Sequence, residues 1–379
     1  MSADALPVCS VLLAGNEKRY VDDCLDTGWI SSSGSYIAAF ERAFADWCGV
    51  RHGIAVCNGT AALHLALQAL DIGPGDEVIV PDFTMIASAF AVCYTGATPV
   101  FADADPGTWN IAPEAAAAEV TPRTRAIMPV HIFGNPCAMP ALRRLARDNG
   151  LFLIEDAAEA HGAVAEGKRA GALSDIAAFS FFANKNVTTG EGGMALTDDA
   201  ELAARCRRFR NLCFPPDAPR AYIHDAVGFN YRMSNLHAAV GLAQTEKADV
   251  YRELRIRNGL LYRRLLSDVP GIVLQDIQPG CESVFWMNGI CVRAAEYGRT
   301  RDELAARLRG RGIDTRLFFN GMHRQPALRK YGCDCAGAYP ASDFLADNGL
   351  YLPGGSALDV CGIQRVCAEI AAFARPGAY

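Results

Sequence analysis

The sequence predicts an α/β protein with a large domain, built on a mostly parallel mixed sheet flanked by helices, and a smaller C-terminal α+β domain. Two observations lead to this prediction. Between residues 54 and 197, short apolar runs alternate with longer helical patterns, which is typical of a parallel sheet covered on both faces. The chain is also 379 residues long, which is more than one hydrophobic core usually fills.

The predicted strands are short runs rich in apolar residues, at 54–57, 77–80, 98–102, 125–130, 152–155, 176–180 and 193–197. Several of these runs end in polar or glycine-containing residues, at Asn58-Gly59-Thr60, Pro81-Asp82, Pro129-Val130-His131 and Asp156. Ligands of open α/β sheets bind beyond the carboxyl ends of the strands. These four strand ends are therefore expected to converge on one site.

The C-terminal half follows a different pattern. From residue 235 to residue 266 the apolar positions recur at helical spacing, which predicts one long helix or two linked helices that join the domains. After Pro270 the pattern changes to strand-like pieces at 283–292 and helices at 301–311. The predicted domains are 1–250 and 251–379.

Composition excludes several classes of partner. The net charge is -6, the pI is near 5.7 and no Lys/Arg run stands out, so neither nucleic acid nor a membrane surface is an expected partner. The first seven residues lack the basic start of an export signal, which predicts a cytoplasmic protein. The fourteen cysteines are scattered, and Cys333 and Cys335 are too close in sequence for a zinc knuckle. We therefore expect neither disulfides nor a metal site.

Lys185 is the first candidate catalytic residue. It follows the predicted strand 176–180 in a segment that carries no other charge until Glu191, and the glycine-rich Gly190-Glu-Gly-Gly193 comes next. A lysine that is desolvated in such a segment has a lowered pKa, and its free amine can form a Schiff base. The alternative is a surface lysine in a polar turn.

Asp156 and the Gly59-Thr60 turn could complete a site with Lys185. Asp156 ends a predicted buried strand, where a carboxylate needs a cation or a strong donor, such as a protonated pyridinium nitrogen. The alternative for Asp156 is a helix N-cap. Gly59-Thr60 lies between a strand and a helical run, where free amides bind phosphate-sized anions. No P-loop or dinucleotide-binding motif in the sequence competes for this role.

In this chain order, these three features resemble fold-type-I pyridoxal-phosphate enzymes, and more narrowly the DegT/DnrJ/EryC1/StrS family of sugar aminotransferases. The resemblance covers roughly residues 10 to 370. It rests on motifs spread over the chain: Gly28-Trp-Ile-Ser, Phe40-Glu41, Asn58-Gly-Thr-Ala-Ala-Leu63, Pro129-Val-His-Ile-Phe-Gly134, Glu155-Asp-Ala-Ala158, Ser180-Phe…Lys185…Gly190-Glu-Gly-Gly193 and Gly228-Phe-Asn-Tyr-Arg-Met233. Each motif alone is weak support, and the set is specific.

The resemblance implies that Lys185 is catalytic: it binds pyridoxal 5′-phosphate covalently and then shuttles protons. It implies that Asp156 binds the pyridinium nitrogen and that Asn230 reaches the cofactor phosphate of the neighbouring subunit. The site would then be incomplete in a monomer, which implies a homodimer with shared active sites. The other residues implied to bind the cofactor are Gly59, Thr60, Ala61 and Ser180 at the phosphate, and Met85, Ala158 and Glu159 around the ring.

Two of these positions depart from the commonest pattern of the family. Met85 stands where relatives often have an aromatic residue that stacks on the cofactor ring. Glu159 stands where many relatives have glutamine or histidine, and this variant resembles the subgroup that aminates GDP-linked 4-keto-6-deoxy sugars. Relatives that remove a C3 hydroxyl have histidine in place of Lys185. Because histidine cannot form a Schiff base, Lys185 favours transamination over dehydration.

The resemblance gives weaker indications for the substrate. Trp29 and His323 lie in segments similar to those that meet the sugar nucleotide in relatives, with core packing and a hydrogen-bonded structural role as the respective alternatives. His131 and His161 are expected to be structural.

The expected reaction moves an amino group from L-glutamate to C4 of GDP-4-keto-6-deoxymannose, giving GDP-perosamine for O-antigen and lipopolysaccharide synthesis. It would proceed through pyridoxamine 5′-phosphate in two half-reactions. Alternatives are an aminotransferase for a dTDP- or UDP-linked 3- or 4-keto sugar, or for an oxidised octulosonate. A rival from another class is a catalytically idle regulatory relative.

Overall fold

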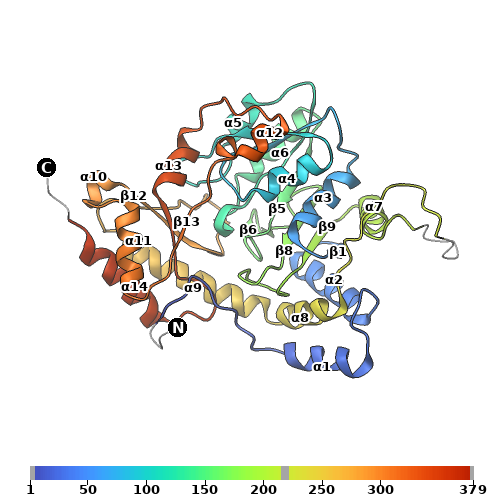
Figure 1. The fold of residues 1–379 in the computed structure, drawn as a ribbon, viewed down its shortest axis with the longest axis horizontal. Helices are drawn as coiled ribbons and strands as arrows, with labels where there is room; N and C mark the ends of the chain where they lie inside the picture. Colours follow the sequence, from blue (N-terminus) through green and yellow to red (C-terminus); the bar gives the residue numbers. More distant parts are fainter. Residues whose placement is uncertain (1–4, 215–221, 376–379) are drawn as a thin grey trace.

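The computed structural model describes residues 5–214 and 222–375, and at its centre is a seven-stranded sheet (Figure 1). The strand order is β1-β9-β8-β5-β4-β2-β3; β9 is antiparallel to both neighbours and the other neighbouring pairs are parallel. The bounds are β1 (His52–Val56), β2 (Glu77–Pro81), β3 (Thr98–Ala102), β4 (Thr124–Ile127), β5 (Phe152–Asp156), β8 (Ile176–Ser180) and β9 (Gly193–Thr197). All seven predicted strands are present, and the predicted mostly parallel mixed sheet is confirmed.

Helices cover both faces of this sheet because alternate strand residues point to opposite sides. Val78 and Val80 pack on one side with α3 (Gly59–Ala69), α4 (Ala87–Tyr94) and α7 (Ala200–Arg210). Ile79 points to the other side, where α5 (Pro113–Ala118) and α6 (Met139–Asp148) lie. On that same side, Phe40 and Phe44 of α2 (Ser35–Cys48) pack over β1, β8 and β9.

The predicted helical stretch 235–266 forms two linked helices, α8 (Asn235–Thr245) and α9 (Ala248–Leu266). The helix α8 packs between α1 (Glu17–Thr27) and α2, whereas α9 leads to the C-terminal region and packs against its last helix (Figure 1). The prediction that this stretch joins two parts of the molecule agrees with this course.

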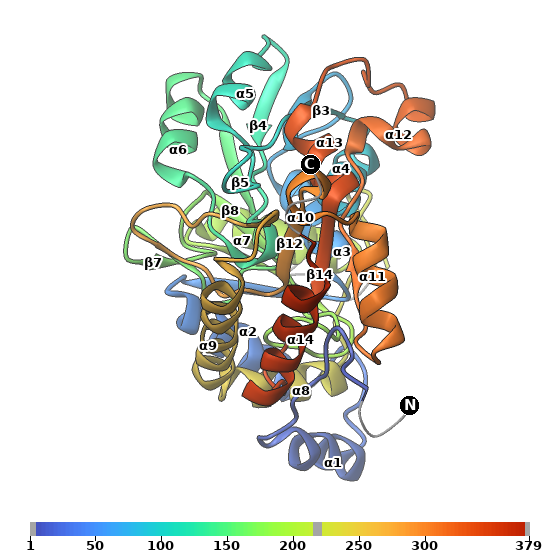
Figure 2. The same ribbon diagram turned by 90° about the vertical axis from the view of Figure 1, so that its left-hand side faces the viewer.

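The C-terminal region is built on a four-stranded antiparallel sheet in the order β10-β12-β14-β13 (Figure 2). Its elements are β10 (Ile272–Leu274), β12 (Asn288–Val292), α10 (Ala294–Tyr297), α11 (Arg301–Gly310), β13 (Arg316–Leu317), η2 (Met322–Arg324), α12 (Pro326–Tyr331), α13 (Pro340–Asn348), β14 (Gly349–Leu352) and α14 (Val360–Phe373). The remaining short elements are η1 (Ile132–Gly134), β6 (Val164–Ala165), β7 (Lys168–Arg169) and β11 (Cys281–Glu282). Of the strand-like pieces predicted at 283–292, the second half forms β12 and the first half is not a strand, because Phe285 has a left-handed φ of 47°.

The N-terminal segment lies along the C-terminal region. The amide of Leu6 donates to the Gly312 carbonyl at 2.9 Å, and the Asp314 amide donates to the Leu6 carbonyl at 2.9 Å. The sequence alone assigned these first residues to the large domain, whose boundary near residue 250 falls at the start of α9 and stays a prediction.

In the part of the chain that the structure describes, no helix combines the length and the apolar character needed to cross a membrane. No group of three or more His, Cys, Asp or Glu side chains within those residues is placed to hold a metal ion. All fourteen cysteines are free thiols.

Candidate active site

A cavity of about 480 Å³ lies at the carboxyl ends of the parallel strands. Three of the four strand ends that the sequence predicts to converge on one site meet there, at Asn58-Gly59-Thr60, Val130 and Asp156. The fourth strand end, at Asp82, does not line the cavity; its carboxylate is hydrogen-bonded to His323 instead. The other lining residues are Leu63, Thr84, Met85, Ala87, Ala158, Glu159, Ser180, Phe182, Asn184, Lys185, Glu191, Trp286 and Phe319.

Lys185 lies in this cavity, on the segment between β8 and β9. Its Nζ is 3.8 Å from the centroid of the Trp286 ring. Burial lowers the pKa of the Lys185 amine, and the Glu159 and Asp156 carboxylates partly offset that effect. An amine with a lowered pKa is more often unprotonated at neutral pH, which is the form that attacks an aldehyde.

Asp156 is the last residue of β5 and is 5% exposed. Its Oδ2 accepts a hydrogen bond from Ser88 Oγ at 2.7 Å, and its Oδ1 accepts one from the Ala158 amide at 3.2 Å. Burial raises the pKa of this carboxyl, and the Ser88 and Ala158 hydrogen bonds lower it. The residues after Asp156 form turns, so the helix N-cap alternative is wrong. A buried carboxylate on the cavity wall can pair with a protonated ring nitrogen.

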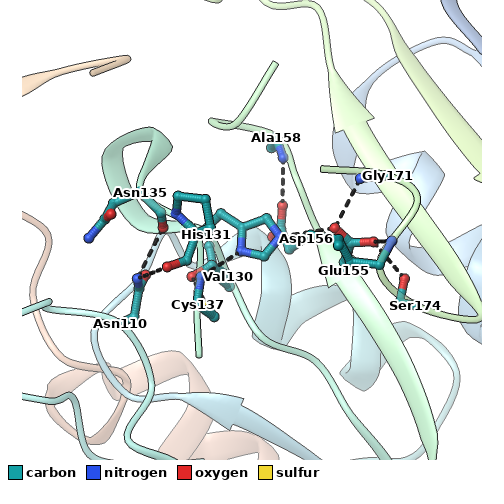
Figure 3. A network of polar contacts seen from close by, with 12 residues as sticks. Asn110, Val130, His131, Asn135, Cys137, Glu155, Asp156, Ala158, Gly171 and Ser174 are labelled. Atoms are coloured by element: carbon teal, nitrogen blue, oxygen red, sulfur yellow. Dashed lines mark hydrogen bonds and ion pairs between the residues drawn. The ribbon is translucent and has the colours of Figure 1, made fainter. Parts of the chain in front are cut away.

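A buried network beside Asp156 fixes the end of β5 (Figure 3). Glu155 accepts hydrogen bonds from the Gly171 and Leu173 amides, from Ser174 Oγ and from His131 Nε2, at 2.9–3.0 Å. Since His131 Nδ1 accepts from the Cys137 amide at 3.1 Å, the proton of His131 lies on Nε2. Burial raises the pKa of Glu155, but His131 and the amides outweigh it, so the net shift is downward. Glu155 stays ionised, and His131 has the expected structural role.

Glu159 forms another part of the cavity wall and is 4% exposed. Its Oε2 accepts a hydrogen bond from the Phe133 amide at 2.7 Å. Burial raises the pKa of Glu159 to about 7, and the nearby Lys185 amine acts in the opposite direction. This carboxyl can therefore gain or lose a proton near neutral pH beside the lysine.

The start of α3 forms a small cradle with Ser180. Gly59 and Thr60 lie in the first turn, where amides have no partner within the helix. A Cβ on Gly59 would lie 2.7 Å from Ser180 Cβ, so glycine is needed for the close approach of the two segments. The amide of Ala61 donates to the Asn58 side chain at 2.8 Å. The role predicted for Ala61 at the phosphate stays a prediction.

These residues fit pyridoxal 5′-phosphate. The cavity offers an amine to bind an aldehyde, a buried carboxylate for a ring nitrogen, and a cradle of amides and hydroxyls for a phosphate. Two buried polar atoms in its lining, Thr84 Oγ1 and Asn184 Oδ1, have no hydrogen-bond partner among the described residues and can serve a ligand. The bound cofactor supplies an electron sink for cleavage of bonds at the substrate carbon.

Four predicted residues do not line this cavity: Ala61, which is buried in α3, and three that lie farther away. Trp29 is 59% exposed and lines a separate groove of about 310 Å³, so it is not packed in the core of the chain. His323 is hydrogen-bonded to Asp82 at 2.8 Å and pairs with Asp343 at 3.2 Å, which is the structural arrangement left open as its alternative. Asn230 is exposed, and its contribution to a neighbouring subunit's site stays a prediction.

Sequence reasoning did not select Trp286 or Ser88 as site residues. Trp286 lies in the irregular stretch before β12, and Ser88 is an ordinary hydroxyl early in α4. Their cavity partners, Lys185 and Asp156, are 101 and 68 positions away in the chain. No local pattern could have indicated these pairs.

Comparison with known proteins agrees with this site. Residues 12–371 match the DegT/DnrJ/EryC1/StrS aminotransferase family. The chain is 46% identical to the GDP-perosamine synthase of Caulobacter vibrioides, with 96% of this chain and 97% of that protein covered. It is 42% identical to the GDP-perosamine synthase of Escherichia coli O157:H7, with 97% and 98% covered. The crystal structure of S. venezuelae DesV in complex with a ketimine intermediate has a TM-score of 0.91 and 36% identity, covering 98% of this chain and 99% of that chain.

The fold and the cavity therefore define a fold-type-I aminotransferase that depends on pyridoxal 5′-phosphate. The predicted fold class, enzyme class and cofactor are confirmed. Within that class, the chain belongs to the DegT/DnrJ/EryC1/StrS aminotransferase family, and its resemblance to the perosamine-forming subgroup is confirmed as well.

The cradle gives a first testable prediction. We expect Gly59→Ala to weaken cofactor binding, because the added Cβ must push α3 away from Ser180. Overpacking of this kind costs about 1–3 kcal/mol, which corresponds to a roughly 5- to 150-fold increase in the Kd of pyridoxal 5′-phosphate. Titration of the apoenzyme with pyridoxal 5′-phosphate measures this Kd. Gly310→Ala is the control, since its Cβ would meet no atom within 4 Å; equal affinities for both variants would contradict the cradle.

His161 gives a prediction on pH. It is 1% exposed and its Nδ1 accepts from the Val187 amide, and burial lowers its pKa from 6.5 to about 3. Because the folded pKa is depressed, the stabilisation is present above pH 6.5 and is lost as the pH falls toward 3. Wild type should lose about 2 kcal/mol more stability than His161→Gln between pH 7 and pH 5. Calorimetry of both apoenzymes as a function of pH tests this difference in stability. Tm values that fall in parallel with pH in the two proteins would exclude a contribution from His161.

Proposed function

We propose that this enzyme transfers the amino group of L-glutamate to C4 of GDP-4-keto-6-deoxymannose, forming GDP-perosamine and 2-oxoglutarate. The observation that carries the choice of sugar is the similarity, over nearly the full length of each chain, to relatives named GDP-perosamine synthase. The intact lysine, carboxylate and cradle support an active enzyme over an idle regulatory relative.

We assign roles to the residues around the cavity as follows. Lys185 Nζ removes the proton from Cα of glutamate in the first half-reaction and delivers a proton to C4 of the sugar in the second. The Asp156 carboxylate keeps the ring nitrogen protonated, and burial strengthens this interaction because water does not screen it. The phosphate is anchored by Gly59, Thr60, Ala61 and Ser180, and the ring is bordered by Met85, Ala158 and Glu159.

The proposal includes a homodimer in the cytoplasm. Asn230 is exposed and lies outside the cavity of its own chain, which leaves it free to reach the cofactor phosphate of a second copy. Each active site would then depend on both subunits.

The test uses purified holoenzyme, L-glutamate and GDP-4-keto-6-deoxymannose, with dTDP- and UDP-linked 4-keto-6-deoxy sugars and an oxidised octulosonate in parallel. We expect one amine at C4 of the GDP-linked sugar, identified by product mass and by NMR, with the C3 hydroxyl retained. Turnover of another keto sugar without turnover of the GDP-linked one would overturn the assignment.

A further inference from the structure

Arg255 of α9 is a buried cation outside the set of residues considered so far. It is 3% exposed, and no carboxylate lies within ion-pair distance of it among the described residues. A buried charge is costly unless hydrogen bonds replace its lost hydration. Its Nη1 donates to the Trp286 carbonyl at 2.7 Å and its Nη2 donates to the Asn184 carbonyl at 3.1 Å. The guanidinium is therefore held by main-chain oxygens.

Both acceptors belong to the active-site cavity. Asn184 directly precedes Lys185, and its carbonyl also accepts from Trp286 Nε1 at 3.0 Å. The Trp286 ring in turn lies 3.8 Å from Lys185 Nζ. Arg255, the Asn184 peptide and Trp286 thus form a closed set of contacts around the lysine. Cys9 also contacts this set: its Sγ lies 3.7 Å from both Arg255 Nη2 and the Asn184 carbonyl oxygen.

This set joins distant parts of the chain. Arg255 comes from the helix that leads to the C-terminal region, Lys185 from the segment between β8 and β9, and Trp286 from the stretch before β12. The forked guanidinium can hold two carbonyls at fixed positions at once, which a lysine ammonium on a flexible stem does less well.

We propose that Arg255 is a positioning residue for amino transfer, which fixes the Lys185 peptide and the Trp286 ring relative to each other so that Nζ starts from one defined place. This inference rests on the proposed function of the site, since it deepens the role of Lys185. It predicts that Arg255 affects the rate of proton transfer more than the binding of substrate.

The test compares Arg255→Gln and Arg255→Lys holoenzymes in the glutamate half-reaction, followed by stopped-flow absorbance without any sugar. We expect the limiting rate constant of this half-reaction to fall on the order of 10- to 100-fold in both variants, because small displacements of a catalytic group have effects of this size, while the apparent Kd for glutamate changes less than about threefold. Arg264→Gln is the control, since Arg264 is an exposed arginine of the same helix.

A second readout separates positioning from stability. The groups that act on the Lys185 amine are Glu159, Asp156, Cys9 and Arg255, and Arg255 is the cation among them. In Arg255→Gln the pH midpoint of the holoenzyme absorbance should therefore move upward, whereas Arg255→Lys keeps the charge and a midpoint near that of wild type.

A lowered Tm with an unchanged half-reaction rate constant and an unchanged pH midpoint would overturn the proposal and leave Arg255 a structural residue. If Arg255→Gln does not fold, the half-reaction rate constant of Arg255→Lys tests the proposal by itself: a rate equal to that of wild type would overturn it. Failure of the wild type on the GDP-linked sugar, with the Arg255 effects intact, would remove the substrate assignment and support the positioning role.

Discussion

Replacing Lys185 with alanine is expected to lower amino transfer by about 10⁴-fold or more, since we propose that its amine both holds the cofactor and moves the proton. The variant should still bind pyridoxal 5′-phosphate through the cradle and Asp156, because those residues are unchanged. Turnover of glutamate and the keto sugar, measured by product mass, checks the first expectation. Cofactor retained after gel filtration checks the second.

The covalent role of Lys185 can be tested separately. Sodium borohydride reduces a carbon–nitrogen double bond to a stable single bond, so treated wild type should carry the cofactor on the peptide that contains Lys185. Lys168→Ala is the matched control, because Lys168 is an exposed lysine of β7 and should leave activity and labelling unchanged. Labelling of any other lysine in wild type would contradict the assignment.

Replacing Asp156 with asparagine is expected to have the second largest effect. The side chain keeps its shape and one carbonyl oxygen but loses the charge that stabilises a protonated ring nitrogen. Removing one partner of a buried, hydrogen-bonded charge pair costs about 2–5 kcal/mol, which corresponds to a roughly 30- to several-thousand-fold loss of kcat. Cofactor affinity should change much less, since the phosphate cradle is intact. Single-turnover kinetics with glutamate measure the loss.

Two comparisons sharpen this test. Ser88→Ala keeps the carboxylate and removes only the 2.7 Å hydrogen bond to it, so its loss should be on the order of tenfold. A cofactor analogue methylated on the ring nitrogen carries a permanent positive charge and should restore part of the activity of Asp156→Asn. Activity of Asp156→Asn within about threefold of wild type would show that the carboxylate does not act on the ring.

The main sheet and its helices could be predicted because their signals are local. The seven strands were visible as short apolar runs, since each is buried on both faces of the sheet. The absence of a strand at 283–287 could not be predicted, because an apolar run does not reveal that Phe285 adopts a left-handed backbone. The course of the N-terminal segment was also hidden. Its pairing partners, such as Ile313, lie about three hundred positions away.

The sequence by itself determined the class of fold and the candidate chemistry of Lys185, Asp156 and the Gly59-Thr60 turn, because strand periodicity and turn chemistry depend on neighbouring residues. Only the tertiary structure decided that Ser88 bonds to Asp156, that Trp286 faces Lys185, and that Arg255 holds both segments. Such contacts join residues from separate elements. Their energy depends on burial and hydrogen-bond geometry, which exist only after the chain has folded.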